Sequence, residues 1–386
     1  MRQDVDDHVK IAGGAAALAG LALAVAACGD DHPPQPDAPP ARSGPRAVIA
    51  AGTFMAGEAG VLSALWLEPM EVDPLVAPAG AVGDDPMIRR AGGELFVVNR
   101  SDGNNVTILD AATFAVKEQL ATGAGSNPQD VAVHGDQLFL PAFDAEGVVV
   151  VTRGTGARST IDLSALDPDG HPNCVSAYTV GDEIYVVCEL LDGSYKPRGP
   201  GRVAVIDAAS RAVKTTFPLA GANPVGALEQ LPAGVLGGDL VIPTAENIIG
   251  DPTIGCVERI QTGAAPRSNG CLVTNQALGG YAARLDVQLR FGTPILWLVV
   301  NRYDGGARGG LRGYDLDAQM LWSAAISPPA QVLVDLAVCP NGAIVVADQT
   351  MAASGLRLYD GIMELTAAPM PIGLRPGSAH GLACYE

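Results

Sequence analysis

The amino-acid sequence predicts an all-β fold, a seven-bladed β-propeller, with six or eight blades as the alternatives. Segments of the chain repeat one another, and short apolar strands recur at regular intervals. No stretch after Cys28 shows the periodicity of an amphipathic helix. Glycine (47) and proline (29) are abundant, which favours many turns over long helices.

The repeats define the unit of the fold. Residues 96–103 (FVVNRSDG) match residues 298–305 (LVVNRYDG), and residues 106–117 (VTILDAATFAVK) match residues 203–214 (VAVIDAASRAVK). A shorter unit pairs residues 130–133 with residues 335–338. Each unit reads as strand, tight turn, strand, Asp/Gly loop, strand ending in Asp, turn and strand. Four strands in about 40–50 residues are typical of a propeller blade.

The spacing of the strands gives the blade count. The second strand of each unit is expected at residues 48–51, 95–99, 138–142, 184–188, 240–244, 295–300 and 344–347. Residues 47–386 number 340, and units of about 49 residues divide them into seven blades.

The two ends of this domain are expected to share a blade. The first unit, from Ala47, lacks an innermost strand, and residues 380–385 (HGLACY) resemble the innermost strand at residues 335–339 (DLAVC). The C-terminal strand would therefore complete the first blade and leave no open sheet edge.

The repeat pattern resembles a known family. A Val-x-Asn strand end, an Asp-Gly loop, a Val-x-Val-Ile-Asp-x-x-Thr-x-x-Val segment and then Asn-Pro are similar to the YVTN repeat of YncE-like propellers. The pattern appears in residues 97–116, 127–128, 203–213 and 223–224. It covers residues 85–231 well and the rest loosely. The resemblance implies blade architecture, and no catalytic residue can be carried over from it.

The N-terminus predicts export and a lipid anchor. Residues 11–27 are uncharged and almost all Ala, Gly, Leu or Val, a length that fits the apolar region of a signal peptide better than a bilayer span. Residues 23–29 (LAVAACG) look like a lipobox, so Cys28 is expected to be lipidated after removal of residues 1–27. A plain secretory signal or a poor transmembrane anchor is the alternative.

A tether is expected between the anchor and the folded domain. Residues 28–46 begin with Cys28 and contain six prolines, which favour an extended, semi-rigid chain. The predicted organisation is therefore a signal peptide (1–27), a lipidated tether (28–46) and a propeller (47–386). The predicted location is extracytoplasmic, anchored by lipid to the cell membrane or the outer membrane.

Six further cysteines are expected to form disulfides, because an even set in an exported protein is typical of them. Cys174 and Cys188 flank a hairpin that turns at Gly181-Asp182, where a bridge across the strands is within reach. Cys256 and Cys271 enclose a short insertion, which leaves Cys339 to pair with Cys384. A metal site and buried free thiols are the alternatives, but zinc-type Cys spacing is absent.

The net charge of the chain narrows the classes of partner that are expected. The net charge is −18 at pH 7, which repels phosphate backbones and argues against nucleic acid. The predicted partners are the membrane, through the lipid on Cys28, and an unknown protein, peptide or glycan.

The loops around one mouth of the tunnel form the candidate binding face, because function on such scaffolds sits in loops. The candidates on this face are Asn99, Arg100, Asp102, His171, Glu189, Asn301, Arg302, Asp304 and His380. Asn and Asp before Gly are also ordinary turn formers, which is the structural alternative. Two arginines at a tunnel mouth suit a carboxylate or phosphate, although pairing with local Asp residues is the simpler expectation.

The sequence predicts no catalytic residues and no metal site. The segments at residues 167–170 (DPDG) and 102–105 (DGNN) carry oxygens that suit Ca²⁺, but neither has EF-hand spacing. The P-loop and the Gly-x-Ser-x-Gly elbow do not occur in the sequence. The leading interpretation is a non-catalytic binding or scaffold module at the cell envelope. The alternatives are a metal-assisted lactonase- or lyase-type enzyme using His171, Glu189 and His380, and a structural surface protein without a ligand.

Overall fold

The computed structural model describes residues 44–305, 310–377 and 380–386. The segments assigned above to the signal peptide and to Cys28 lie outside the described residues, and so does most of the tether. Within the described ranges, no helix has the length and apolar character needed to cross a bilayer.

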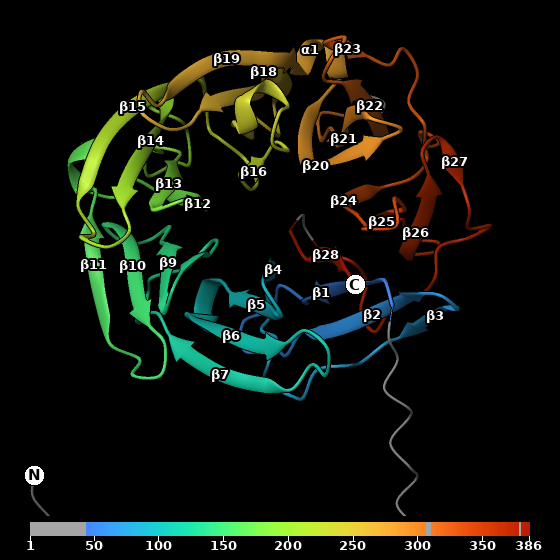
Figure 1. Ribbon diagram of the computed structural model, residues 1–386, viewed down its shortest axis with the longest axis horizontal. Coiled ribbons are helices and arrows are strands. Elements are labelled where there is room, and N and C mark those ends of the chain that lie inside the picture. The colour runs from blue at the N-terminus through green and yellow to red at the C-terminus, as the bar shows by residue number, and fades with distance from the viewer. Residues whose placement is uncertain (1–43, 306–309, 378–379) are drawn as a thin grey trace, which may run out of the picture. The chain divides into compact units, whose positions relative to one another are not determined.

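Seven four-stranded antiparallel sheets form a ring, so the chain is a seven-bladed β-propeller, as the repeats predicted (Figure 1). From the innermost strand outward, blade 1 consists of β28 (Leu382–Tyr385), β1 (Arg46–Ala51), β2 (Val61–Leu67) and β3 (Met70–Asp73). Blade 2 consists of β4 (Pro86–Ala91), β5 (Glu94–Asn99), β6 (Asn105–Asp110) and β7 (Val116–Ala121). Blade 3 consists of β8 (Ala132–His134), β9 (Gln137–Pro141), β10 (Gly147–Thr152) and β11 (Arg158–Asp162).

In the same order, blade 4 consists of β12 (Cys174–Val180), β13 (Glu183–Cys188), β14 (Pro200–Asp207) and β15 (Val213–Ala222), and blade 5 of β16 (Glu229–Gln230), β17 (Leu240–Asn247), β18 (Asp251–Gln261) and β19 (Arg267–Thr274). Blade 6 consists of β20 (Tyr281–Arg290), β21 (Thr293–Asn301), β22 (Gly310–Asp315) and β23 (Met320–Leu321). Blade 7 consists of β24 (Leu333–Val338), β25 (Ile344–Asp348), β26 (Gly355–Asp360) and β27 (Met363–Glu364). The described residues also include one short α-helix, α1 (Asn275–Leu278).

The repeated Asp residues form turns. In the β6–β7 turn, Asp110 accepts hydrogen bonds from the amides of Ala112 and Thr113, both at 3.0 Å. In the β14–β15 turn, Asp207 accepts one from the amide of Ser210 at 2.8 Å. These bonds hold the turn backbone where the chain reverses, which is the usual role of Asp in such positions. Repetition of this motif in the sequence therefore reflects blade geometry.

The ring closes through the C-terminal strand, as expected. Strand β28 pairs with β1 in antiparallel register, from Arg46 opposite Tyr385 to Ile49 opposite Leu382. In Figure 1 the red end of the chain lies beside the blue first strand for this reason. The first blade is thus built from both ends of the domain, and its innermost sheet edge is covered.

Three disulfides have the pairing expected from the sequence: Cys174–Cys188, Cys256–Cys271 and Cys339–Cys384. The first joins two strands of blade 4, and the third joins the last blade to the closing strand. Disulfides are typical of proteins that fold in an oxidising, extracytoplasmic compartment.

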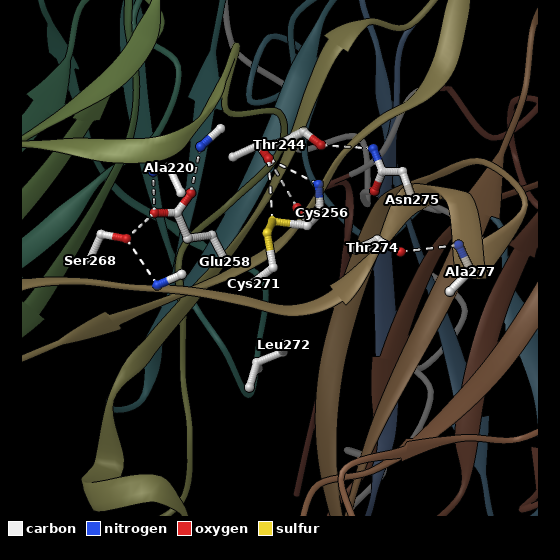
Figure 2. The surroundings of a disulfide bond; sticks show 12 residues. Ala220, Thr244, Cys256, Glu258, Ser268, Cys271, Leu272, Thr274, Asn275 and Ala277 are labelled. Atoms are coloured by element: carbon white, nitrogen blue, oxygen red, sulfur yellow. Dashed lines mark hydrogen bonds between the residues drawn. A yellow bond between two sulfur atoms is a disulfide. The ribbon is translucent and has the colours of Figure 1, made fainter.

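Blade 5 is tied to blade 4 beside its own disulfide (Figure 2). Glu258 is fully buried, and its carboxylate accepts hydrogen bonds from the amides of Ala220 at 2.7 Å and Gly221 at 3.0 Å on β15. The hydroxyl of Ser268 bonds to the same carboxylate. A buried carboxylate is tolerated only when its oxygens accept hydrogen bonds. Because two of these bonds come from blade 4, Glu258 holds the two blades at a fixed spacing.

Candidate functional site

A layer of buried and half-buried charges on or beside the innermost strands crosses the tunnel. This charge layer consists of Arg89, Asp130, Glu229, Arg284 and Asp335. Arg89 of blade 2 donates two hydrogen bonds to Asp130 of blade 3, both at 2.8 Å, and a third to Glu229 of blade 5 at 3.0 Å. Arg284 of blade 6 bonds to the same Glu229 oxygen at 2.6 Å and lies 3.3 Å from Asp335 of blade 7.

The aspartates of the charge layer also join neighbouring blades. One oxygen of Asp130 accepts hydrogen bonds from the hydroxyl of Ser176 at 2.7 Å and the amide of Ala177 at 3.1 Å on β12. Asp335 makes the matching contact with the amide of Leu382 on β28 at 2.8 Å. These two residues occupy equivalent positions in the repeat, so the repeated Asp-x-Ala-Val segment provides a blade-to-blade link.

Paired charges dominate the electrostatics of this layer. Burial alone lowers the pKa of Arg89, but the carboxylates of Asp130 and Glu229 outweigh it and the pKa rises. Burial raises the pKa of Asp335 to about 6 even though Arg284 opposes the shift. Asp286, next to the layer on β20, also has its pKa raised to about 6, by burial and by Glu229.

The charge layer separates two cavities that share no lining residue. The mouth cavity, of about 230 Å³, is lined by Met87, Arg100, Gln129, Asp130, Val175, Glu189, Val225, Gly226, Ala227, Ile248, Tyr281, Ala283, Asn301, Tyr303, Val334 and His380. The far cavity, of about 320 Å³, lies on the other side and includes Arg89, Arg90, Val133, Tyr178 and Asp286. The mouth cavity is therefore a blind recess that opens at one end of the tunnel.

The mouth cavity brings together some of the candidate residues and leaves others outside. Arg100, Glu189, Asn301 and His380 line it. Asn99 is instead buried in blade 2, where its side chain accepts a hydrogen bond from the amide of Gly83 at 2.8 Å. Asp102 and His171 are exposed and are not among the lining residues.

The two candidate arginines pair with local aspartates, which was the simpler expectation. Arg100 bonds to Asp85. Arg302 makes two hydrogen bonds to Asp304, at 3.0 Å and 2.6 Å, and lies outside the mouth cavity. Asp167 and Asp169, considered above for Ca²⁺, both form ion pairs with Arg198, at 3.1 Å and 2.7 Å. No three His, Cys, Asp or Glu side chains within the described ranges are grouped so as to hold a metal ion.

Glu189 is the unusual group of the mouth cavity. It follows β13, its exposed fraction is 9%, and its carboxyl has no hydrogen bond or ion pair with any described residue. Burial therefore raises its pKa to about 8, and the side chain is a neutral carboxylic acid at pH 7.

His380 reaches across the tunnel from the segment that leads into β28. Its ring approaches Gly226 of blade 5, where an added Cβ would lie 3.2 Å from the imidazole, so a larger residue there would crowd the ring. Its Nδ1 atom is buried and has no hydrogen-bond partner among the described residues. Burial, together with Arg284, Arg100 and Arg89, lowers the pKa of His380 well below its ordinary value, so the ring is neutral.

Glu189 makes stability depend on pH in a defined direction. Its pKa is about 8 when folded against an ordinary value of 4.5, so between these values the unfolded chain releases a proton that the folded chain keeps. Stability is therefore lost as pH rises through this window. We expect the free energy of unfolding of Glu189→Gln, relative to the unchanged chain, to rise with pH by up to about 1.4 kcal/mol per unit.

This pH effect is measured by urea unfolding of both chains at several values from about pH 5 to about pH 8. Asp286 and Asp335 titrate in the same window, but they are common to both chains and cancel in the difference. Two parallel stability curves would show that Glu189 is ionised in the folded protein.

The fold and the site define a class of protein, a seven-bladed propeller with a blind polar recess at one mouth of its tunnel. No protein-family model matches the chain, and no curated protein matches it in sequence. Solved propeller structures do resemble it.

One of these structures is a putative 6-phosphogluconolactonase from Bacteroides fragilis NCTC 9343, with a TM-score of 0.58 and 16% identity over 88% of this chain and 98% of that one. Another is a quinonprotein alcohol dehydrogenase-like protein from Bacteroides thetaiotaomicron VPI-5482, with a TM-score of 0.53 and 12% identity over 84% and 75% of the two chains. A third, the dihydro-heme d1 dehydrogenase NirN in complex with DHE, has a TM-score of 0.50 and 16% identity over 84% and 73%. At these identities the likeness shows the fold alone.

Sequence reasoning missed Arg89, Glu229 and Arg284 of the charge layer. The strands that carry them could be placed, but which of their side chains face the tunnel depends on the pairing register of each strand. A shift of the register by one residue turns every side chain to the opposite face. The aspartates were visible as a repeat, because residues 130–133 and 335–338 match.

Proposed function

We propose that this chain is a lipid-anchored, extracytoplasmic propeller of the YVTN/YncE kind, which acts as a non-catalytic binding module and takes its ligand in the mouth cavity. The anchor rests on the lipobox-like segment that ends at Cys28, and the compartment is supported by the three disulfides.

The observation that carries the binding role is the pair of unpartnered polar groups in a blind recess. The Glu189 side chain, which is 9% exposed, has no hydrogen bond or ion pair with a described residue, and the buried His380 Nδ1 atom has no hydrogen-bond partner among them. A buried polar group without a partner costs roughly 1–3 kcal/mol of stability. A ligand that bonds to both groups offsets this cost, whereas the charges of the layer beneath are paired with one another.

A cavity-filling pair of variants tests the binding role. Val175 and Val133 are half-buried valines on innermost strands, and they line the mouth cavity and the far cavity respectively. We expect Val175→Trp to abolish ligand-induced thermal stabilisation, and Val133→Trp to preserve it. The measurement is a thermal-shift screen of the mature chain against amino acids, carboxylates, amines, nucleosides and sugars. A ligand that is lost from Val133→Trp and kept by Val175→Trp, or a screen without any ligand, would contradict the proposal.

The anchor is tested separately on the full chain. Radiolabelled palmitate should be incorporated into the unchanged protein and not into Cys28→Ser, which should also leave the membrane fraction. Label retained by Cys28→Ser would place the lipid elsewhere and overturn this part of the proposal.

A second candidate, an enzyme, is favoured by one observation. The mouth cavity holds a protonated carboxyl, Glu189, and a neutral imidazole, His380, which are the forms needed for general acid and general base catalysis near neutral pH. The third residue of the sequence-based metal site, His171, is exposed and is not among the residues that line the cavity. Turnover of a screened ligand that is lost in both Glu189→Gln and His380→Ala would support this candidate over simple binding.

A further inference from the structure

The charges that line the mouth cavity are balanced within the protein. Arg100 is paired with Asp85, and Asp130 is paired with Arg89. Glu189 and His380 are both in their neutral forms at pH 7. A charged ligand would lose its hydration on entry and find no unpaired opposite charge among these groups to replace it. The balance therefore favours an uncharged ligand.

The polar groups of the cavity suit hydroxyl partners. A protonated carboxyl such as Glu189 both donates and accepts hydrogen bonds, and so does the side-chain amide of Asn301. The Nε2 atom of Gln129 is already bonded to Asn127 at 2.7 Å. The Nδ1 atom of His380 adds another buried group without a described partner. Hydroxyl groups also donate and accept, so several hydroxyls around one small molecule match this mixed set better than a carbonyl or an amine.

The remaining wall of the cavity is aromatic and aliphatic. The rings of Tyr281 and Tyr303 lie 6.2 Å apart at an angle of 41°. Met87, Val175, Val225 and Val334 provide aliphatic surface. The volume of about 230 Å³ is below the roughly 300–1,000 Å³ of pockets for drug-sized ligands, which limits the buried part of the ligand to about one ring.

From these features we infer that the mouth cavity binds an uncharged hexose ring, either as a free sugar or at the end of a glycan. The carbon face of the ring packs against the tyrosines, and its hydroxyls bond to Glu189, Asn301 and His380. The inference rests on the proposed binding role of the same cavity and specifies its ligand.

The test uses matched neutral and charged sugars on the purified mature chain. Calorimetric titration is carried out with the methyl glycosides of glucose, galactose, mannose and N-acetylglucosamine, each beside its uronate or amino counterpart. At least one neutral glycoside should bind, and its charged counterpart should bind at least about tenfold more weakly, which corresponds to about 1.4 kcal/mol.

Tyrosine variants give the matched control. Tyr303→Ala should weaken binding of the neutral glycoside at least about tenfold, because it removes one face of the ring contact. Tyr195→Ala should leave binding unchanged, because Tyr195 is an exposed tyrosine that does not line the cavity. An oligosaccharide that ends in the bound sugar and binds more tightly than the free glycoside would identify a glycan as the source.

The outcomes separate this inference from the proposed function. If none of the neutral glycosides binds, or a charged counterpart binds equally well, the sugar assignment is wrong. If another class of compound still binds in the thermal-shift screen and its binding is blocked by Val175→Trp, the binding role of the mouth cavity stands without the sugar assignment. If nothing binds in either experiment, both are overturned.

Discussion

Deletion of Leu382–Glu386 is expected to abolish cooperative folding of the propeller. The deletion removes β28, and with it the hydrogen-bonded ladder from Arg46–Tyr385 to Ile49–Leu382. Leu382 and Tyr385 are each only 1% exposed, and the Tyr385 hydroxyl donates a hydrogen bond to the carbonyl of Ala111 in the neighbouring blade at 3.0 Å. The deletion therefore removes core packing and exposes a new sheet edge at the same time.

The expected magnitude of this deletion follows from its parts. Loss of a large buried side chain costs roughly 2–5 kcal/mol, and so does loss of a native disulfide, here Cys339–Cys384. Two buried side chains and one disulfide together approach the roughly 5–15 kcal/mol that stabilises a typical protein. Calorimetry should show no cooperative melting transition in the truncated chain, or one that is far lower in temperature.

Two controls divide this effect into its causes. Deletion of Glu386 alone should be neutral, because that residue is exposed and lies beyond β28. The double variant Cys339→Ser, Cys384→Ser keeps the strand and should lose only the disulfide contribution. An unchanged melting temperature after deletion of residues 382–386 would show that the closing strand does not hold the ring.

Replacement of Arg89 by alanine is expected to destabilise the protein by roughly 3–5 kcal/mol, the usual effect of breaking a buried ion pair from one side. Asp130 is 1% exposed and would lose two hydrogen bonds from the guanidinium, and Glu229 would lose one. These carboxylates would then remain in the tunnel with reduced compensation. The free energy of unfolding in urea measures the loss.

Arg90 provides the matched control for Arg89. It is the next residue along β4 and is exposed, and among the described residues its side chain contacts only the Tyr385 ring, at 5.1 Å. Arg90→Ala should therefore cost less than about 1 kcal/mol. Adding Asp130→Asn to Arg89→Met should recover part of the loss, because Asp130 then carries no unpaired charge and Glu229 keeps its bond to Arg284. Equal effects of Arg89→Ala and Arg90→Ala would show that the charge layer does not stabilise the ring.

The charge layer also bears on how the mouth cavity works. Asp130 lines the mouth cavity and is held by two hydrogen bonds from Arg89 of the neighbouring blade, so this part of the cavity wall is fixed before any ligand arrives. A fixed wall reduces the ordering cost of binding.

Much of the fold could be predicted because each repeated segment is short and can be recognised in the sequence alone. The second strands, the closing strand and the turns at Asp110 and Asp207 follow from short segments whose chemistry determines their own conformation. The Cys174–Cys188 disulfide followed from the same placement, since a hairpin brings the two residues within reach. The other two were predicted from the short insertion between Cys256 and Cys271 and from the two cysteines that remained.

The candidate site was harder to predict because equivalent residues of the repeat do different things. Asn99 and Asn301 occupy matching positions, yet Asn99 bonds to the backbone of Gly83 while Asn301 lines the mouth cavity. Arg100 and Arg302 also match, and only Arg100 lines that cavity. The neighbouring loops, which do not repeat, decide each outcome.

The sequence by itself predicted seven blades, with six or eight as the alternatives, and it predicted the closure of the ring because the C-terminal strand resembles a repeated one. It also predicted the pairing of the cysteines. The tertiary structure decided that Arg89 meets Glu229 across the tunnel and that Glu189 and His380 are buried in one recess. These contacts join residues from different blades, and their distances depend on the strand register and the curvature of the whole ring.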